Sequence, residues 1–274
     1  MNRVLNLLSQ QKPLVMGILN TTPDSFSDGG CFDSVNKALE QAQLMIAEGA
    51  DIIDIGGEST RPGAKAVSVE DEIQRVIPVI QALREISDVA ISIDTSKPAV
   101  MKLAVESGAD LVNDVNALQA ESAVDVCAQL NVPVCLMHMQ GQPRTMQQQP
   151  EYNDVVVDIK KYLQQRISAC EVAGIKKHNI IIDPGFGFGK TLAHNLSLLK
   201  HLEDFLVLEC PLLIGVSRKS MIGAILGAEV DDRLSGGLAA TVLAYTKGTR
   251  IFRVHDVKPT VDALKICSAM SNAE

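Results

Sequence analysis

Eight short apolar runs, each about as long as a β-strand, recur along the chain and alternate with stretches of helical periodicity. They are LVMGILN from Leu14, DIIDIGGES from Asp51, AISIDTS from Ala90, LVNDVNA from Leu111, VPVCLMHM from Val132, NIIIDPGFG from Asn179, PLLIGVSRK from Pro211 and IFRVHDV from Ile251. Their apolar residues are consecutive rather than alternating, which is typical of strands buried on both faces of a parallel sheet. Eight strand–helix pairs predict an α/β protein, specifically a (β/α)8 or TIM barrel. An open doubly wound sheet is the alternative.

The intervening segments carry helix-boundary signals. Residues 34–48 have the spacing of an amphipathic helix, with Asp33 or Ser34 as its N-cap and Gly49 as its end. Pro98, which follows DTSK, fits the first helical position, where a proline loses no hydrogen bond. These signals support a strand–helix alternation and favour the barrel.

The chain is expected to form one domain over residues 1–274, with residues 1–13 as an N-terminal extension. It has 274 residues, of which 46% are apolar and 21% charged, so a sizeable core is available. No linker or shift in composition divides it. The longest apolar run, LVLECPLLIGV, is short and interrupted by Glu209, so no membrane span is predicted.

The net charge of −8 argues against general nucleic-acid binding, which normally needs a basic surface. Six scattered cysteines show no zinc-type spacing and are too sparse for a disulfide framework. We expect them to be reduced and mostly buried. With no signal peptide at the start of the sequence, the expected location is the cytoplasm.

Polar residues follow all eight predicted strands, and in a barrel such ends converge on one face that holds the active site. In chain order they are Asn20, Glu58 to Arg61, Asp94, Asn113 with Asp114, His138, Asp183, Ser217 to Lys219, and Arg253 with His255. Asn113 and Asp114 are adjacent, so only one of them can point into the barrel. Helix caps and structural ion pairs are the alternative explanation for each single residue, and Asp94 in particular could cap the next helix.

Asp183 lies after three isoleucines and should be largely buried, so it needs a partner. The following GFGFGK lacks the spacing of a phosphate-binding P-loop. Its glycines instead indicate tight turns and a close approach to a flat ligand, with Phe186 and Phe188 as apolar walls. Arg253 and His255, two residues apart, share one strand face and, with Lys219, form a cationic corner that suits an anionic substrate.

The motifs MGILNTTPDSFSDGG, IDIGGESTRPGA, IDTSKP, LVNDV, LMHMQGQPRTMQ, DPGFGFGK, GVSRKSMIG and RVHDV occur in this order. Together they resemble the dihydropteroate synthase family of bacterial folate biosynthesis, over essentially the whole chain from Leu14 to Val257. The resemblance implies a (β/α)8 barrel that joins 6-hydroxymethyl-7,8-dihydropterin pyrophosphate to para-aminobenzoate and releases pyrophosphate. It also implies a homodimer and inhibition by sulfonamides.

The resemblance also implies roles for individual residues. The pterin would be bound by Asp94, Asn113, Met137, Asp183, Phe188 and Lys219. The pyrophosphate would be bound by Asn20, Thr60, Arg253 and His255, with Mg²⁺ held through Asn20. The aminobenzoate would lie against Phe26, Arg61, Pro62, Phe188, Ser217 and Lys219.

The implied reaction has SN1 character: pyrophosphate leaves first and the aniline nitrogen then attacks the pterin methylene. The resemblance implies that Asp94, Asp28, Lys219, Arg253 and His255 carry the catalysis, with Asp94 and Asp28 stabilising the intermediate cation. Residues 21–30 would form a lid over the site, and Asn20 would mark the end of the strand before it.

Three other functions remain open at this point. A methyltetrahydrofolate-binding barrel of the corrinoid methyltransferase type shares the pterin residues but needs no pyrophosphate site. A Schiff-base aldolase would use Lys219 as its nucleophile. An inactive pterin-binding paralogue would be expected to have lost loop residues, which are intact here.

Overall fold

The computed structural model describes residues 2–21, 31–59, 66–141, 145–147 and 149–273. Its eight strands are all parallel and follow the order β6-β5-β4-β3-β2-β1-β8-β7. They are β1 (Leu14–Asn20), β2 (Ile52–Gly56), β3 (Ala90–Asp94), β4 (Leu111–Asp114), β5 (Val134–Met137), β6 (Ile180–Asp183), β7 (Leu213–Ile214) and β8 (Ile251–Val254). A parallel bridge between Ile182 and Leu212 joins β6 to the chain entering β7. The predicted barrel is therefore confirmed, and the open sheet is not found.

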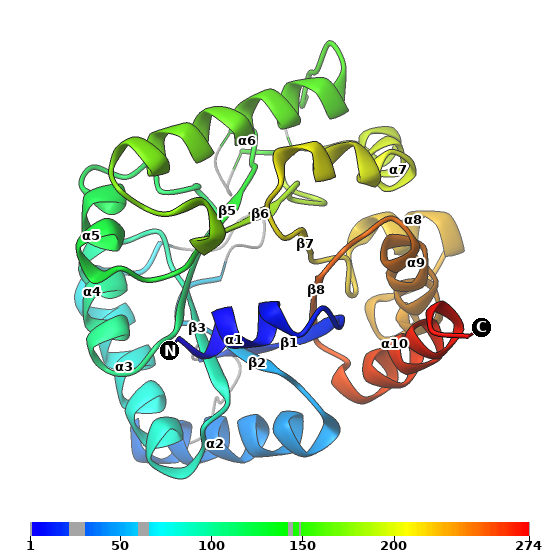
Figure 1. Cartoon of the computed structure of the whole chain (residues 1–274). Coiled ribbons are helices and arrows are strands. Elements are labelled where there is room, and N and C mark those ends of the chain that lie inside the picture. The colour runs from blue at the N-terminus through cyan, green and yellow to red at the C-terminus, as the bar shows by residue number, and fades with distance from the viewer. Residues whose placement is uncertain (1, 22–30, 60–65, 142–144, 148, 274) are drawn as a thin grey trace.

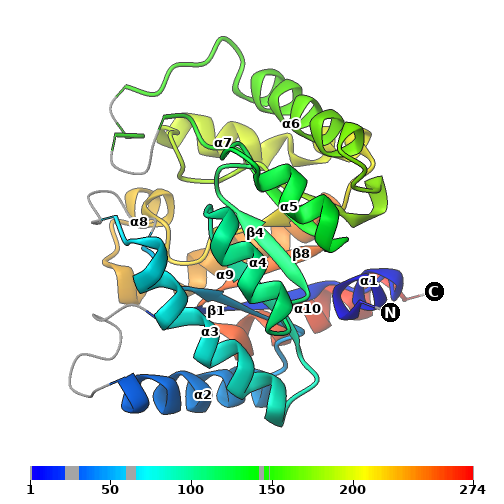
Figure 2. The same ribbon diagram turned by 90° about the vertical axis from the view of Figure 1, so that its left-hand side faces the viewer.

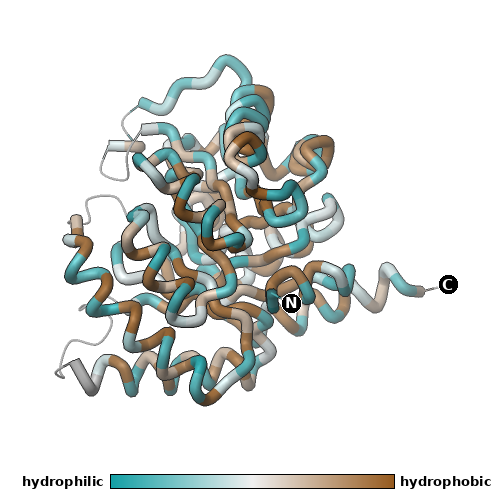
Figure 3. The backbone as a smooth tube through the Cα atoms, turned by 60° about the vertical axis from the view of Figure 1, so that its left-hand side comes forward, coloured by the Kyte–Doolittle hydropathy of each residue, from teal (hydrophilic) through white to brown (hydrophobic). Residues whose placement is uncertain are grey.

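Helices α2 to α10 surround the strands, and α1 lies across one end of the barrel (Figure 1). The α-helices are α1 (Arg3–Ser9), α2 (Cys31–Glu48), α3 (Val69–Ile86), α4 (Pro98–Glu106), α5 (Ala123–Leu130), α6 (Val155–Val172), α7 (Leu192–Lys200), α8 (Ser220–Leu226), α9 (Leu234–Thr246) and α10 (Val257–Ser271). Short 3-10 helices are η2 (Lys177–Asn179), η3 (Leu202–Leu208) and η4 (Val230–Asp232). The tube in Figure 3 alternates between hydrophilic and hydrophobic residues along the outer helices, as expected when each helix buries one face.

Two boundary predictions have different outcomes. Asp33 and Ser34 lie inside α2, which begins at Cys31, so neither is its N-cap. The prediction placed the start too late because it relied on capping residues, and polar residues in a first turn mimic caps. The C-terminal end is as predicted: Gly49 has φ of +102°, a conformation that favours glycine. Pro98 is the first residue of α4, also as predicted.

The interior of the barrel is divided into two layers along its axis. The lower layer is apolar and contains one or two side chains from each strand, namely Leu14, Met16, Ile52, Ala90, Leu111, Cys135, Ile181, Leu213 and Ile251. Because side chains alternate across a strand, the next inward positions are two residues further along. Those positions include Asp54, Ser92, Asn113, Asp183 and Arg253, so the layer toward the carboxyl ends of the strands is polar.

The N-terminal extension closes the apolar end of the barrel. Val4 of α1 is fully buried in the lower layer, and Leu7 and Leu8 pack beside it. Asn2 caps the helix and also donates to the carbonyl of Asp110 at 2.8 Å, while Arg3 bonds the Asp110 carboxylate. Figure 2 shows α1 near the C-terminus at one end of the barrel. Any site must therefore use the opposite end.

The cysteines in the described part of the chain are free and buried: Cys127, Cys135, Cys170, Cys210 and Cys267. Burial raises the pKa of the Cys170 and Cys210 thiols to about 11, so both are protonated at neutral pH. Within the described ranges, no helix has both the length and the apolarity needed to cross a membrane.

Candidate active site

One arginine joins two carboxylates in the polar layer. The Arg253 side chain, from β8, donates through Nε to Asp54 Oδ2 and through Nη2 to Asp94 Oδ2, both at 2.6 Å. Asn113 Nδ2 donates to the same Asp54 oxygen at 3.2 Å. Ion pairs thus join β8 to β2 and β3 across the barrel, and a hydrogen bond joins β4 to β2. The expected inward direction of Asn113 is confirmed, since Asp114 points outward and accepts from the N–H groups of Asn116 and Leu118.

Asp54 is the site residue that the sequence analysis missed. Its side chain is fully buried on β2, and Oδ1 is among the described buried polar atoms that have no hydrogen-bond partner. A carboxylate so deep in a barrel must be balanced by charge. The available signal was an aspartate in the middle of the apolar run DIIDIG, where a purely structural strand would have no use for it.

Asp94 and Arg253 both have shifted pKa values in this cluster. Burial raises the pKa of Asp94 to about 7, Arg253 opposes this shift, and the negative charge of Asp54 adds to it. Burial alone would lower the pKa of Arg253, but Asp54 and Asp94 raise it above its ordinary value. Arg253 is therefore a permanent cation, while Asp94 can change its protonation near neutral pH. The contact with Arg253, rather than a helix cap, explains the position of Asp94.

Asp183 and Lys219 form the second charged part of the mouth. Asp183 Oδ1 accepts from the backbone N–H of Gly185 at 2.7 Å, and burial raises the pKa of this carboxyl while Lys219 opposes the shift. Burial lowers the pKa of Lys219 to about 8, against the attraction of Asp183. The Lys219 ammonium donates to the carbonyl of Phe186 and lies 4.4 Å from the centre of the Phe188 ring.

Apolar surface adjoins these charges. Met137 is buried at the end of β5, where its backbone pairs in register with Asp183. Phe188 is half-buried above it in the chain after β6, whereas Phe186 is fully buried and lines no surface. The prediction of two phenylalanine walls is therefore wrong for Phe186, whose ring belongs to the core while its carbonyl binds Lys219.

The remaining described residues of the mouth lie at the ends of β1, β7 and β8. Asn20 ends β1 and is paired in register with Gly56, which in turn pairs with Asp94. The Ser217 hydroxyl accepts from the backbone N–H of His255 at 3.2 Å and lies 3.2 Å from its ring Nδ1. Asn20, Ser217 and His255 are all half-buried.

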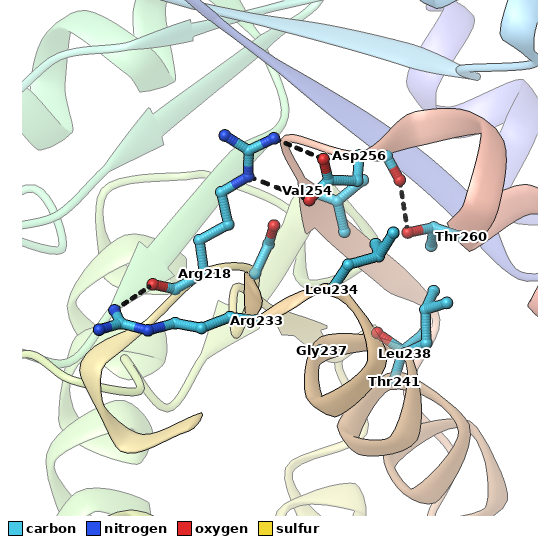
Figure 4. A pocket seen from close by; sticks show the side chains of 10 residues that line it. Arg218, Arg233, Leu234, Gly237, Leu238, Thr241, Val254, Asp256 and Thr260 are labelled. Atoms are coloured by element: carbon cyan, nitrogen blue, oxygen red, sulfur yellow. Dashed lines mark hydrogen bonds and ion pairs between the residues drawn. The ribbon is translucent and has the colours of Figure 1, made fainter. Parts of the chain in front are cut away.

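Three polar strand ends do not face the mouth, contrary to expectation. His138 is buried outside the strand ring, with its ring edge-on to Tyr162 at 4.8 Å. Arg218 is paired with Asp256 at 2.5 Å, as Figure 4 shows, so its charge is already matched. Glu58 bonds Lys97. Each of these residues either lies on the outward-facing side of its strand or follows the end of the strand. A list of the residues at strand ends does not show on which side each one lies.

Five predicted site residues lie outside the described residues: Phe26, Asp28, Thr60, Arg61 and Pro62. Their implied roles stay predictions. The described residues contain no group of three His, Cys, Asp or Glu side chains that could hold a metal ion. Asn20 offers one amide oxygen, which fits Mg²⁺ only where substrate oxygens and waters complete the shell.

A model of the family described as "Pterin binding enzyme" matches residues 16–255. The dihydropteroate synthase of Escherichia coli (strain K12) is 52% identical over 267 residues, which cover 97% of this chain and 95% of that protein. The chain belongs to the dihydropteroate synthase family of pterin-binding enzymes. The Haemophilus influenzae dihydropteroate synthase is 54% identical over 261 residues, covering 95% of each chain.

Solved structures of family members have the same fold. The Yersinia pestis dihydropteroate synthase, in a structure with a sulfonamide drug complex, superposes with a TM-score of 0.91 at 52% identity, covering 96% of this chain and 95% of that one. The Xanthomonas albilineans enzyme in complex with 7,8-dihydropteroate superposes with a TM-score of 0.88 at 46% identity, with the same coverage. The family expected from the sequence motifs is therefore confirmed.

Proposed function

We infer that this chain is an enzyme that condenses 6-hydroxymethyl-7,8-dihydropterin pyrophosphate with para-aminobenzoate to give 7,8-dihydropteroate and pyrophosphate. The observation that carries the inference is the mouth of the barrel. There, buried acceptors on β2, β3, β4 and β6 lie opposite cations from the ends of β7 and β8. Its relatives with this function match along almost the whole chain.

The pterin fits the Asp183 side of the mouth. Its 2-amino-pyrimidinone edge presents adjacent N–H groups, which a carboxylate can accept as two parallel hydrogen bonds. Asp183 is the buried carboxylate for that edge, and the Asn113 amide can both donate and accept beside it. Lys219 supplies a donor for the opposite, acceptor-rich edge of the pterin. Met137 and Phe188 provide the apolar surfaces for the flat ring.

The leaving pyrophosphate fits the Arg253 side. Two of the five N–H donors of Arg253 are used by Asp54 and Asp94, so the others remain for phosphate oxygens. His255 can add a second donor, and Thr60 is a further predicted contact. Asn20 would hold Mg²⁺, which supplies charge stabilisation to the departing pyrophosphate. As the pterin methylene becomes cationic, the ionised Asp94 carboxylate stabilises it, and Asp28 is proposed to do the same.

The aminobenzoate is proposed to lie between Phe188, the Lys219 stem and the residues Phe26, Arg61 and Pro62. Ser217 would contact its carboxylate. In the structure the Ser217 hydroxyl oxygen accepts a hydrogen bond from the His255 backbone N–H. The hydroxyl can keep that bond while it donates its own hydrogen to the aminobenzoate carboxylate. No strong base is needed, because an aniline nitrogen loses its extra proton readily after it has added. Sulfonamides would compete at this position, in line with the drug complex of the Yersinia relative.

A pyrophosphate-release assay with and without aminobenzoate tests the function. Release that requires both substrates and Mg²⁺ is the expected result. Absence of release under saturating substrates would favour a pterin-binding barrel of the methyltransferase type or an inactive paralogue. An aldolase is tested by borohydride trapping of a carbonyl substrate at Lys219, which we expect to fail.

Asp183→Ala should abolish binding of the pterin pyrophosphate, whereas Asp28→Ala should mainly lower turnover.

We also propose that two copies pair through one side of the barrel. Helices α7, α8 and α9 contact one another and lie side by side (Figure 1). Together with η3 they expose large apolar side chains, namely Leu192, Leu196, Leu206, Val207, Ile225, Leu226, Leu234, Val242 and Leu243. An apolar face of this kind on a protein with a cytoplasmic biosynthetic role suits a homodimer.

Light scattering after size exclusion tests the pairing. Leu243→Glu should convert a dimer to a monomer. Leu103→Glu is the matched control, because Leu103 is also exposed but lies on α4, which packs between α3 and α5 on the other side of the barrel (Figure 1). A wild-type mass equal to one chain would contradict the proposal.

A further inference from the structure

The segment between β6 and α7 is held almost entirely by side chains. Every backbone carbonyl from residue 185 to residue 191 accepts a hydrogen bond from a side chain. The donors are Lys190 to Gly185 and Phe188, Lys219 to Phe186, Gln147 to Gly187, Tyr152 to Gly189, and Asn195 to Lys190 and Thr191. Backbone groups that lie outside helices and strands need other partners, either side chains or ordered water. Here the polar groups are matched within the protein, which fixes the shape of the segment.

Lys190 is the centre of this arrangement. Its side chain is 3% exposed, and its ammonium lies 2.7 Å from Gly185 O, 2.9 Å from Phe188 O, 3.3 Å from His138 O and 3.1 Å from His138 Nδ1. An ammonium has three donors, so these acceptors saturate it. Burial lowers the pKa of Lys190 well below its ordinary value, against the attraction of Asp183, so the ammonium depends on these partners and on that carboxylate.

His138 acts as a partner of this lysine. Burial lowers the pKa of His138 to about 3, with the charge of Lys190 contributing, so the imidazole is neutral. A neutral ring facing an ammonium accepts through Nδ1, and its other face is packed edge-on against Tyr162. The histidine at the end of β5 thus supports the segment after β6 from behind, which explains why it does not reach the mouth.

The two carbonyls held by Lys190 belong to residues that meet the site. The N–H of Gly185 donates to Asp183 at 2.7 Å while its carbonyl accepts from Lys190 at 2.7 Å. Phe188, whose carbonyl Lys190 also holds, presents its ring to the Lys219 ammonium at 4.4 Å. A displacement of Lys190 would therefore move a hydrogen-bond donor to Asp183 and the aromatic surface beside Lys219 at the same time.

The glycines of the segment leave no room for relaxation. A Cβ at Gly185 would stand 1.9 Å from His138 O, and one at Gly189 would stand 2.4 Å from Gln140 O. The two chain segments after β5 and β6 are thus in direct backbone contact, and Lys190 bonds across that contact. Loss of its charge cannot be compensated by a neighbouring cation, because Lys219 is already bonded to Phe186.

We propose that Lys190 is a positioning residue for the pterin: its buried ammonium holds Gly185 and Phe188 where Asp183 and Lys219 bind the substrate. This inference rests on the proposed function, since it assigns Asp183 to the pterin edge. Lys190 does not touch the substrate. It acts through the segment it fixes and through its positive charge, which favours the ionised form of Asp183.

The charge of Lys190 should affect the pH dependence of pterin binding, which a purely structural role would leave unchanged. Asp183 faces Lys219, Lys190, Arg253 and the buried Cys135 thiol. Removing the positive charge of Lys190 raises the pKa of Asp183, because the ionised carboxylate loses a stabilising neighbour. Pterin binding, which uses the carboxylate, should then be lost at a higher pH in the variant than in the wild type. Asp94 also titrates, but it is common to both proteins, so the difference between them reports Asp183.

The test is calorimetric titration of 6-hydroxymethyl-7,8-dihydropterin pyrophosphate into wild type, Lys190→Met and Lys190→Gln across a pH series. We expect the dissociation constant to rise about tenfold or more in Lys190→Met at neutral pH, with the acidic midpoint of binding displaced upward. Lys190→Gln keeps a donor for the carbonyls, so it should fold more readily and bind less weakly, yet show the same displacement. It keeps the test valid where Lys190→Met fails to fold.

Lys200→Met is the matched control, since Lys200 is exposed at the end of α7 and should leave binding and midpoint unchanged. Two results would overturn the proposal. One is wild-type affinity and midpoint in both Lys190 variants. The other is a fall in melting temperature with wild-type binding by the folded fraction, which would make Lys190 a stability residue alone. A wild type that binds no pterin pyrophosphate would instead refute the proposed function.

Discussion

Replacing Asp54 with asparagine tests whether the network beneath the mouth aims Arg253. The substitution keeps the shape and one acceptor oxygen but removes the charge that receives Arg253 Nε at 2.6 Å. Breaking a buried ion pair costs about 3–5 kcal/mol when the other charge is left unpaired. Arg253 would still be paired with Asp94 at 2.6 Å, so we expect about half of that, ~2 kcal/mol. For a domain of this size, that lowers the melting temperature by about 4–8 °C.

The catalytic effect should exceed what this loss of stability explains. With Asp54 neutral, Arg253 is held from one side only and can shift toward Asp94 and away from the departing pyrophosphate. A misplacement of about 1 Å costs up to ~100-fold in rate. We therefore expect kcat to fall about 10- to 100-fold, with a smaller change in KM, when steady-state pyrophosphate release is measured well below the melting temperature.

Asp114→Asn is the matched control for this measurement. Asp114 is as buried as Asp54, but it points out of the barrel and bonds two backbone N–H groups. Its variant should lose stability while kcat stays at the wild-type value. If Asp54→Asn and Asp114→Asn reduced stability alike and both kept wild-type kcat, the network would be a stability element and the reasoning about Arg253 would be refuted.

Three further outcomes follow from other parts of the structure. The kcat/KM for the pterin pyrophosphate should rise with pH through about 7 as Asp94 ionises and fall above about 8 as Lys219 loses its proton. In a pH–rate profile, Asp94→Asn should remove the rise near pH 7 and leave only the acidic loss of binding that comes from Asp183. Asp110→Asn, at the closed end of the barrel, should reduce the free energy of unfolding by about 1–3 kcal/mol in urea titrations with kcat unchanged. Lys97→Met removes the cation that Glu58 shares with a buried glutamate, and Glu58 also accepts from the Val67 N–H. Because Glu58 and Val67 flank Arg61 and Pro62 in the chain, the variant should raise KM for aminobenzoate more than KM for the pterin pyrophosphate.

The strands could be predicted because burial on both faces leaves a strong local signature. Each of the eight apolar runs forms a strand, since a parallel sheet inside a helical ring has no polar face to interrupt the run. The residues near the ends of those runs could also be predicted to belong to the site where they face into the barrel, as Asn113 and Asp183 do. The start of α2 was misplaced because caps are weak signals, and a first turn can hold the same polar residues.

Residues whose role depends on a distant partner could not be predicted from local pattern. Asp54 and Arg253 are 199 positions apart, and only closure of the barrel brings β2 and β8 to a common interior. In the sequence, Lys190 is only the last residue of a glycine-rich segment, and nothing near it indicates that it is buried. Its burial appears only when the chain after β5 supplies His138 behind it. Asp54 is paired with a residue far away in the chain, and Lys190 needs His138 in addition to its neighbouring carbonyls.

The division of the barrel interior explains how this fold tolerates so many buried charges. The lower layer and α1 supply apolar packing independent of the site, so the free energy that holds the strands together does not rely on the polar layer. The polar layer contains groups of opposite charge that stabilise one another. Arg253 stabilises the carboxylates of Asp54 and Asp94, and Lys219 and Lys190 stabilise that of Asp183. A neutral substitution in the set leaves a partner buried without compensation, whereas one in the lower layer leaves a cavity. The two kinds of change should therefore separate experimentally, with pH-dependent binding altered by the first and only stability by the second.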